Sequence, residues 1–343
     1  MKTKALVFDA LSLAYFAALA LAAALHPTAR EFQHFFQSAA RGFGLVAGLL
    51  ALGGLAAYPF HRFKARTLGS AIFAGPVRDP APPPPWYRNL AVIHFILLFG
   101  LTCYVGGVMT QLSLRDMLDA DGLGGAKRLG LALATPNWKV LPDAILATLQ
   151  TIYMAFLATV FAIPVSFLLS FPAAKNIASR SRAGLALYSV LRLILNVTRS
   201  VEALVWAIIF GVWVGIGPFA GMLALFVHSV ASLTKQYSEI IECVSHGPVE
   251  GIQSTGASLV QELWFGIVPQ IILPYTSFTI YRWDINVRMA TIVGLVGGGG
   301  IGTLLNEYQG EALWHEVGCI IVVIAIVVWL MDSASAYLRE AIK

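Results

Sequence analysis

The sequence predicts an all-α fold, that of a polytopic helical membrane protein with about eight transmembrane helices. Of the 343 residues, 58% are hydrophobic and 12% are charged, and the mean hydropathy is +0.75. A soluble domain carries about 25% charged residues, so the polar surface here is too small to coat a globule of this size. The apolar residues also gather in runs of about 20, the length that an α-helix needs to cross a bilayer.

The first apolar run follows Lys2 and Lys4, as the core of a secretory signal would. It is longer than a usual signal core and ends without a clear small-residue cleavage site, so we expect a retained transmembrane helix. Seven further runs follow along the chain. The predicted spans are Val7–Leu25, Phe43–Phe60, Leu90–Gln111, Asp143–Phe171, Val201–Val214, Phe219–Cys243, Ile271–Gly294 and Leu313–Leu338.

These spans predict three parts of the chain. Residues 1–112 form an N-terminal extension with three transmembrane helices, and residues 113–142, which mix acidic and basic side chains, form an irregular external connecting segment with at most one amphipathic helix. Residues 143–343 form a core with five transmembrane helices. Within the core, residues 183–199 hold Arg192, Asn196 and Arg199 among apolar positions, which indicates an interfacial elbow helix rather than a span.

The loop charges predict that both termini are cytoplasmic. Lys and Arg collect in cytoplasmic loops of membrane proteins. The loop 61–88 and the stretch 173–199 contain five Lys or Arg each, the segment 112–142 contains four, and the loop 26–42 contains two. With an inside N-terminus and eight spans, the two stretches with five basic residues and the C-terminus fall on the cytoplasmic side, so the balance favours this orientation. We therefore expect a multi-pass protein of the cytoplasmic (inner) membrane, in contact with membrane lipid.

The composition also excludes several classes of protein. The net charge of +5 is ordinary for a membrane protein, and no basic cluster alternates with exposed aromatic residues, so we expect no nucleic acid partner. Cys103, Cys243 and Cys319 have neither disulfide nor metal-ligand spacing, so we expect neither a metal nor another cofactor. His94 and His228 lie in apolar spans and are interpreted as packing residues.

The loop 245–269 is the longest weakly apolar break in the second half of the chain. Gly247 is suited to an N-cap and Pro248 to the first helical position, where a missing N–H has no cost. Glu250 then falls at the third position, within reach of the cap. Gly256 ends this helix because glycine adopts a positive φ at little cost. On these grounds alone, the loop is a capped turn between two membrane helices.

A second capping box, Ser258 with Gln261, starts the next helix, and Pro269 opens the following span. Glu250, Gly256 and Pro269 have the spacing of the cytoplasmic signature of ATP-binding-cassette (ABC) importer permeases, which this loop resembles. Gly251 and Ile252 replace the usual pair of alanines, and Gly266 stands where isoleucine is common. The resemblance implies a coupling helix that docks into an ATPase subunit, with the candidate coupling residues Pro248, Glu250, Gly256, Ala257 and Pro269.

The resemblance narrows to the phosphonate branch of that family in four further stretches. They are Gly215–Gly221, Glu239–Glu242, Tyr281–Ala290 and Gly294–Gly302. The similarity covers roughly residues 140–340, and the first part of the chain resembles no family core. The implied fold is an ABC importer type I permease core preceded by extra N-terminal helices.

Four polar residues interrupt the predicted seventh span: Arg282, Asp284, Asn286 and Arg288. Arg288 lies ~28 Å beyond Pro269 along a helix, and charges at such depth are costly unless they are paired. Asp284 and Arg288, four residues apart, can form a purely structural pair. The other interpretation is a cationic lining for an anionic substrate, since arginine binds phosphonate oxygens through two nitrogens. Among these four residues, Asp284 can neutralise only one arginine. The other arginine would then keep a positive charge that could line a translocation pathway.

The glycine run that follows contains the gate candidates Gly297, Gly299, Gly300 and Gly302. It lacks the Lys and Ser/Thr of a phosphate-binding P-loop, so no nucleotide site is visible. A packing point between helices and a gate of the pathway both remain open interpretations. His315 and Glu316 resemble the start of a metalloprotease motif, but Cys319 stands where the second histidine is needed.

The resemblance implies the transmembrane permease subunit of an ATP-driven importer for phosphonate or a related phosphorus oxyanion. Its partners would be two copies of an ATP-binding subunit, a second copy of the same permease and an external phosphonate-binding protein. The chain itself would not be an enzyme. The alternative is an ATP-independent secondary transporter or channel for an anion. A membrane enzyme for phosphorus compounds is a third class, but the sequence lacks a nucleophile motif for it.

Overall fold

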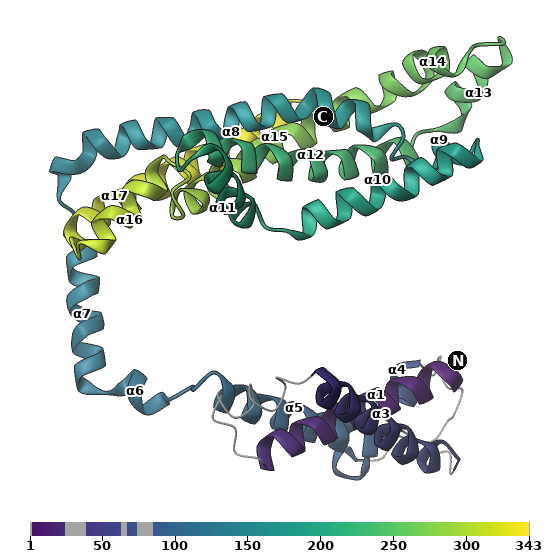
Figure 1. Ribbon diagram of the computed structural model, residues 1–343, viewed down its shortest axis with the longest axis vertical. Helices are drawn as coiled ribbons and strands as arrows, with labels where there is room; N and C mark the ends of the chain where they lie inside the picture. The colour runs from purple at the N-terminus through teal and green to yellow at the C-terminus, as the bar shows by residue number, and fades with distance from the viewer. Residues whose placement is uncertain (1, 25–38, 63–66, 74–84, 343) are drawn as a thin grey trace. The chain divides into compact units, whose positions relative to one another are not determined.

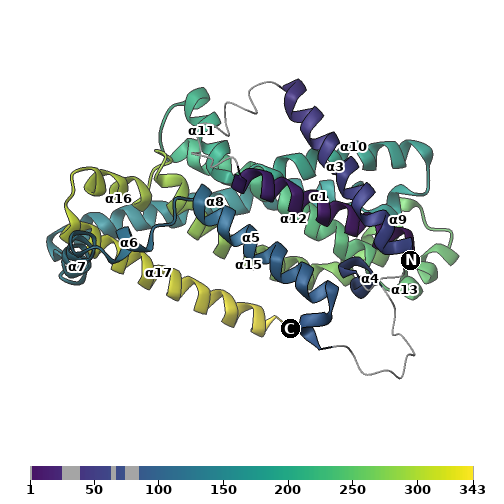
Figure 2. The ribbon, with the colours of Figure 1, turned by 90° about the horizontal axis from the view of Figure 1, so that it is seen from below.

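The computed structural model describes residues 2–24, 39–62, 67–73 and 85–342. Every regular element among these residues is a helix, which confirms the predicted all-α class. The chain divides into two compact units, Met1–Leu123 and Gly124–Lys343, and Figures 1 and 2 show the helices of each from two sides. The domain boundaries expected at residues 112 and 142 stay predictions.

In the first unit, α1 packs against α3, α4 and α5. Asp9 on α1 is 2% exposed, and it ties the short helix α4 to α1. Its carboxylate accepts hydrogen bonds from Thr67 Oγ1 at 2.5 Å and from the Gly69 N–H at 2.6 Å. The helices of this unit are α1 (Lys2–Ala24), α3 (Ala39–Arg62), α4 (Leu68–Phe73), η1 (Trp86–Arg88), α5 (Leu90–Met109) and α6 (Leu114–Leu118).

The second unit begins within α7 (Ala120–Ala134) and is built around α8, α12 and α15, each of which packs against the other two. In Figure 1 the loop that carries α13 and α14 projects at one end of this bundle, and α16 lies at the other end. The remaining elements are η2 (Trp138–Val140), α8 (Leu141–Ser170), α9 (Lys175–Ala178), α10 (Arg182–Ser200), α11 (Ala203–Val214), α12 (Pro218–Glu242), α13 (His246–Ser254), α14 (Leu259–Gln261), η3 (Glu262–Ile267), α15 (Val268–Gly294), α16 (Ile301–Gly310) and α17 (Trp314–Ala341).

The helix contacts in this bundle use small side chains. Ala155 and Ala158 of α8, Ala224 of α12 and Ala290 of α15 belong to one buried cluster and are fully inaccessible. Small residues let helix backbones approach closely, which membrane helices need because lipid gives them no hydrophobic drive to associate. The alanine-rich faces of the predicted fourth and sixth spans are thus the faces through which α8 and α12 pack in the bundle.

Five of the described helical segments are long and apolar enough to cross a membrane: Thr3–Leu21, Leu90–Met109, Trp138–Ala178, Leu259–Gly294 and Trp314–Ala341. A sixth is reached if α10 and α11, which meet at 91°, count as one broken span. The central helix α12 has 25 residues and is less apolar, because its neighbours rather than lipid surround much of it. The total of eight spans stays a prediction.

The structure corrects three expected elements. The predicted fifth span, 201–214, is the 12-residue helix α11, which at 1.5 Å per residue is too short to cross a bilayer without α10, its partner in the bent pair. The segment 113–142 was expected to be irregular with room for one amphipathic helix, but two helices, α6 and α7, make most of it helical. The predicted seventh span begins before Ile271, because helix continues without a break from Leu259 to Gly294. The elbow expected over 183–199 is the helix α10.

Candidate functional site

The loop between α12 and α15 forms two short helices joined at Gly256, as the sequence predicted. Gly256 has a φ of +79°, the left-handed conformation that glycine adopts most easily. The second helix starts with the predicted capping box, in which Gln261 Oε1 accepts hydrogen bonds from the Ser258 N–H at 2.8 Å and from Ser258 Oγ at 3.0 Å. The bend and the second helix start are therefore set by local sequence.

The start of the first loop helix differs from the prediction. The N-cap of α13 is Ser245 rather than Gly247, so Pro248 occupies the third helical position and Glu250 the fifth. Glu250 is therefore too far along the helix to reach back to its cap. The N–H of Ser245 donates instead to Gln270 Oε1 of α15 at 3.0 Å. The helix start is therefore set by a contact with α15 and not by the local Gly247–Glu250 capping pattern.

The loop has one covered face and one open face. Val249 is buried in one hydrophobic cluster with Ile267 at the end of η3 and Ile241 of α12. The candidate coupling residues Pro248, Glu250, Gly256 and Pro269 are exposed, and Ala257 is half-buried. Pro269 lies in the first turn of α15, as predicted. The open face is thus available to another chain, while the covered face ties the loop to the bundle.

A buried polar cluster lies between α12 and α15. Arg282 is 7% exposed, and its Nη2 lies 2.6 Å from His228 Nδ1 while its Nε donates to Ser229 Oγ at 3.2 Å. Within the part of the chain that the structure describes, no carboxylate forms an ion pair with this guanidinium. The structure thus corrects the interpretation of His228 as a packing residue, because its ring is a polar partner of Arg282.

Asn286 extends the cluster to a third helix. Its Nδ2 donates to Ser229 Oγ at 2.8 Å and to Thr159 Oγ1 of α8 at 2.9 Å, and its Oδ1 accepts from Ser229 Oγ at 3.1 Å. Asn286 is 1% exposed and Ser229 is fully buried. The hydroxyl of Ser229 is therefore the centre of a network that joins α8, α12 and α15 and fixes the position of Arg282.

Arg288 lies in a different environment. Its Nη2 donates to Asp284 Oδ2 at 2.6 Å, the pair that the spacing predicted, and its Nη1 lies 3.4 Å from Asp332 Oδ1 of α17. The Arg288 side chain is 43% exposed, and Asp284 is buried. The sequence analysis paired the two arginines only with Asp284 and therefore left one of them without a carboxylate. It omitted Asp332, because this residue lies 44 positions beyond Arg288 in the chain. Arg288 therefore has two carboxylates, and Arg282 has only neutral direct partners.

The glycine run makes the reversal between α15 and α16 and packs tightly. A Cβ on Gly299 would lie 2.6 Å from Pro218 at the start of α12, and one on Gly302 would lie 2.0 Å from the Thr291 carbonyl oxygen. Gly300 donates from its N–H to Gln150 Oε1 of α8 at 3.2 Å. Gly297 meets Ile216 of the α11–α12 hinge in the same way. These contacts support the packing interpretation, and the gate role stays a prediction.

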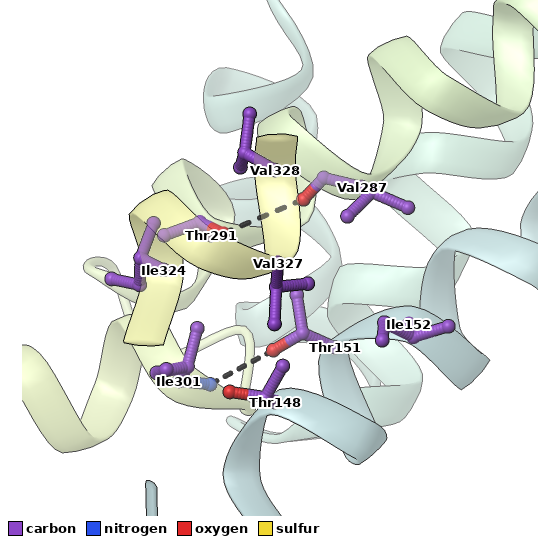
Figure 3. A pocket seen from close by; sticks show the side chains of 9 residues that line it. All are labelled: Thr148, Thr151, Ile152, Val287, Thr291, Ile301, Ile324, Val327 and Val328. Carbon is purple, nitrogen blue, oxygen red and sulfur yellow. Dashed lines mark hydrogen bonds between the residues drawn. The ribbon is translucent and has the colours of Figure 1, made fainter. Parts of the chain in front are cut away.

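The cavity next to this reversal does not suit an anion. It lies between α8, α15, α16 and α17, and its volume of about 10 Å³ holds about one water (Figure 3). Its threonine hydroxyls are already bonded: Thr151 Oγ1 accepts from the Ile301 N–H at 2.9 Å, and Thr291 Oγ1 donates to the Val287 carbonyl at 3.4 Å. The remaining lining is aliphatic. The cluster around Arg282 is therefore the stronger candidate for an anion.

Comparisons with known proteins identify the family of this chain. Residues 166–342 match the family model of the binding-protein-dependent transport system inner membrane component. The chain is 33% identical over 261 residues to a phosphite transport system permease protein of Stutzerimonas stutzeri, which covers 75% of this chain and 91% of that protein. A putative cryptic phosphonate transport system permease protein of Escherichia coli K12 is 42% identical over 119 residues, 35% of this chain and 98% of that protein.

One solved structure supports the fold alone. It shows the MetNI methionine ABC transporter in inward-facing conformations, and one of its chains aligns with a TM-score of 0.53 at 18% sequence identity. The alignment covers 60% of this chain and 99% of that chain. The predicted helical permease architecture is therefore confirmed.

We predict that Ser229→Ala destabilises the bundle, because it leaves Arg282 Nε and the Asn286 amide without their shared partner. The expected loss is about 1–2 kcal/mol of unfolding free energy, seen as a lower thermal unfolding midpoint of the purified chain in detergent. Ser232→Ala is the matched control, since Ser232 lies on the same helix and its hydroxyl has no hydrogen bond among the described residues. Equal midpoints for the two variants would contradict the role of Ser229 as the centre of the network.

Proposed function

Because this chain belongs to the family of binding-protein-dependent transport system inner membrane components, we propose that it carries phosphonate, phosphite or a related phosphorus oxyanion across the membrane. It is a multi-pass inner membrane permease of an ATP-driven importer and not an enzyme. Its partners are an ATP-binding subunit and a substrate-binding protein. This membership favours the importer over an ATP-independent transporter or channel. The phosphite and phosphonate named for its relatives support the choice of cargo.

The single observation that carries the choice of an anion is the environment of Arg282. A guanidinium that is 7% exposed and has only neutral direct partners leaves a positive charge in a region of low polarity. A phosphorus oxyanion that leaves water needs both charge and several hydrogen-bond donors, and one guanidinium supplies both. We assign Arg282, rather than Arg288 with its two carboxylates, as the contact to the substrate. Access to it requires α12 and α15 to move during alternating access.

The assembly follows from the same proposal. Two copies of this chain pair around the pathway, and each receives one ATP-binding subunit at the open face of the α13–α14 loop. Both termini lie in the cytoplasm, which places that loop on the side where ATP is available. The exposed positions of Pro248, Glu250 and Gly256 support docking there, since the rest of the loop is tied to the bundle.

We predict that Arg282→Met lowers uptake of phosphite by about tenfold or more per assembled complex, the effect of losing about 1.5–3 kcal/mol of charged hydrogen bonding. Uptake is measured in proteoliposomes that contain the complex and its loaded binding protein. Arg288→Met is the comparison: because it leaves two carboxylates unpaired, it should reduce the yield of assembled complex but spare uptake per complex. Wild-type uptake per complex in Arg282→Met would refute the assignment of the anion contact.

We predict that Gly256→Val abolishes stable binding of the ATP-binding subunit while membrane insertion is retained. Valine at a φ of +79° is strained by more than about 1–2 kcal/mol, so the bend opens and the docking face changes shape. Gly251→Val is the matched control, since neither glycine has an atom within 4 Å of its Cβ position and only Gly256 has a positive φ. Copurification of the ATP-binding subunit is the measurement, and normal recovery with Gly256→Val would contradict the coupling assignment.

A further inference from the structure

One ion pair joins the α13–α14 loop region to the elbow helix. Arg180 lies in the turn between α9 and α10, and Glu262 is the first residue of η3, directly after α14. The two side chains meet in parallel: Nη1 of Arg180 donates to Oε2 of Glu262 at 2.7 Å, and Nη2 donates to Oε1. Glu262 is 3% exposed, while 41% of the Arg180 side chain is exposed. Such a two-pronged contact fixes direction as well as distance.

Glu262 also marks an irregular point in its helix. Residues Glu262–Ile267 form a π-helix between the capped α14 and the start of α15. A π-helix is rare and is often found at functional sites, because its wider hydrogen-bonding pattern is a local departure from the α-helical ladder. The carboxylate of Glu262 therefore lies at the first residue of this irregular segment of the long helix.

The other side of the pair is anchored to the bundle. The turn that holds Arg180 continues into α10 through Ser181, whose Oγ accepts from the Gly184 N–H at 2.9 Å. Further along α10, Arg192 Nη2 donates to Glu242 Oε1 at the end of α12 at 3.0 Å. The elbow α10 then turns by 91° into α11. Arg180 therefore precedes an element that packs against α12 and leads into α11.

We propose that the Arg180–Glu262 pair is a positioning link that passes movement of the α13–α14 loop to the elbow helix α10. The inference rests on the proposed function, since it assumes that the ATP-binding subunit moves this loop. Among the described residues, this is the only ion pair between residues 245–267 and the rest of the chain. The loop's other contacts are not ionic: Val249 belongs to an apolar cluster that includes Ile241 of α12, and the Ser245 N–H donates to Gln270 of α15.

A role in stability alone does not account for the pair. Ion pairs with an exposed partner contribute about 0–1 kcal/mol, and burying the carboxylate of Glu262 has a desolvation cost. Removing Arg180 alone leaves a buried charge unpaired, whereas Glu262→Gln removes the charge at nearly constant shape. The two variants therefore separate loss of the link from the effect of a stranded carboxylate.

The test uses the complete complex with its ATP-binding subunits in proteoliposomes, with phosphite-loaded binding protein. ATP hydrolysis and phosphite uptake are measured together for the wild type, Glu262→Gln, Arg180→Met and the charge exchange that combines Arg180→Glu with Glu262→Arg. Arg182→Met is the matched control, because Arg182 lies two residues away, is exposed and forms no ion pair among the described residues. A further double variant, Arg180→Met with Glu262→Gln, removes both charges and keeps the comparison valid if the exchange does not assemble.

The link predicts that Glu262→Gln, Arg180→Met and the neutral double variant lower phosphite uptake per ATP hydrolysed by at least about fivefold, the lower end of usual coupling between sites. Copurification of the ATP-binding subunit stays normal, the charge exchange restores uptake per ATP, and Arg182→Met behaves as the wild type. Wild-type uptake per ATP in Glu262→Gln and in the neutral double variant would overturn the inference and leave the proposed function intact. Absence of ATP-dependent phosphite uptake in the wild-type complex would instead overturn the proposed function.

Discussion

One constraint governs how the helices of the second unit pack: polar groups inside a membrane must form their hydrogen bonds within the protein. The cluster around Ser229 satisfies this constraint by taking one side chain from each of three helices, and alanine faces on the same helices let them approach closely enough for those bonds to form. Arg282 is held by this network. The position of the proposed anion contact thus depends on the packing of α8, α12 and α15.

The same helix that holds Arg282 also begins at the cytoplasmic loop. Helix runs without a break from Leu259 to Gly294, so Glu262 and Arg282 lie on one element about 30 Å apart. A force applied at the loop can therefore reach the polar cluster along α15 directly and along the elbow through Arg180. At the other end, the glycine run fixes the reversal into α16 against α8 and the α11–α12 hinge.

The sequence alone could predict what short-range chemistry determines. The bend at Gly256, the capping box of Ser258 and the pair of Asp284 with Arg288 all involve residues within four positions of one another, and the structure contains all three. It could not predict partners that the fold brings together. Asp332, His228 and the Arg180–Glu262 pair are each separated from their partners by more than 40 positions, and the cap of α13 moved because Ser245 met Gln270.

The two arginines of α15 show why this distinction matters for the proposed anion contact. They are six residues apart, so at 100° per residue their side chains leave the helix on different faces. Arg282 lies on the face that contacts α12, where its partners are a histidine ring and a hydroxyl. Arg288 lies on the face that contacts α17, where it meets a second carboxylate, that of Asp332. Because Arg288 is paired with two carboxylates of its own chain, the anion of the proposed function would gain little from it. Arg282 has only neutral direct partners, so in its proposed role an oxyanion that displaces them would gain an attraction that water no longer provides.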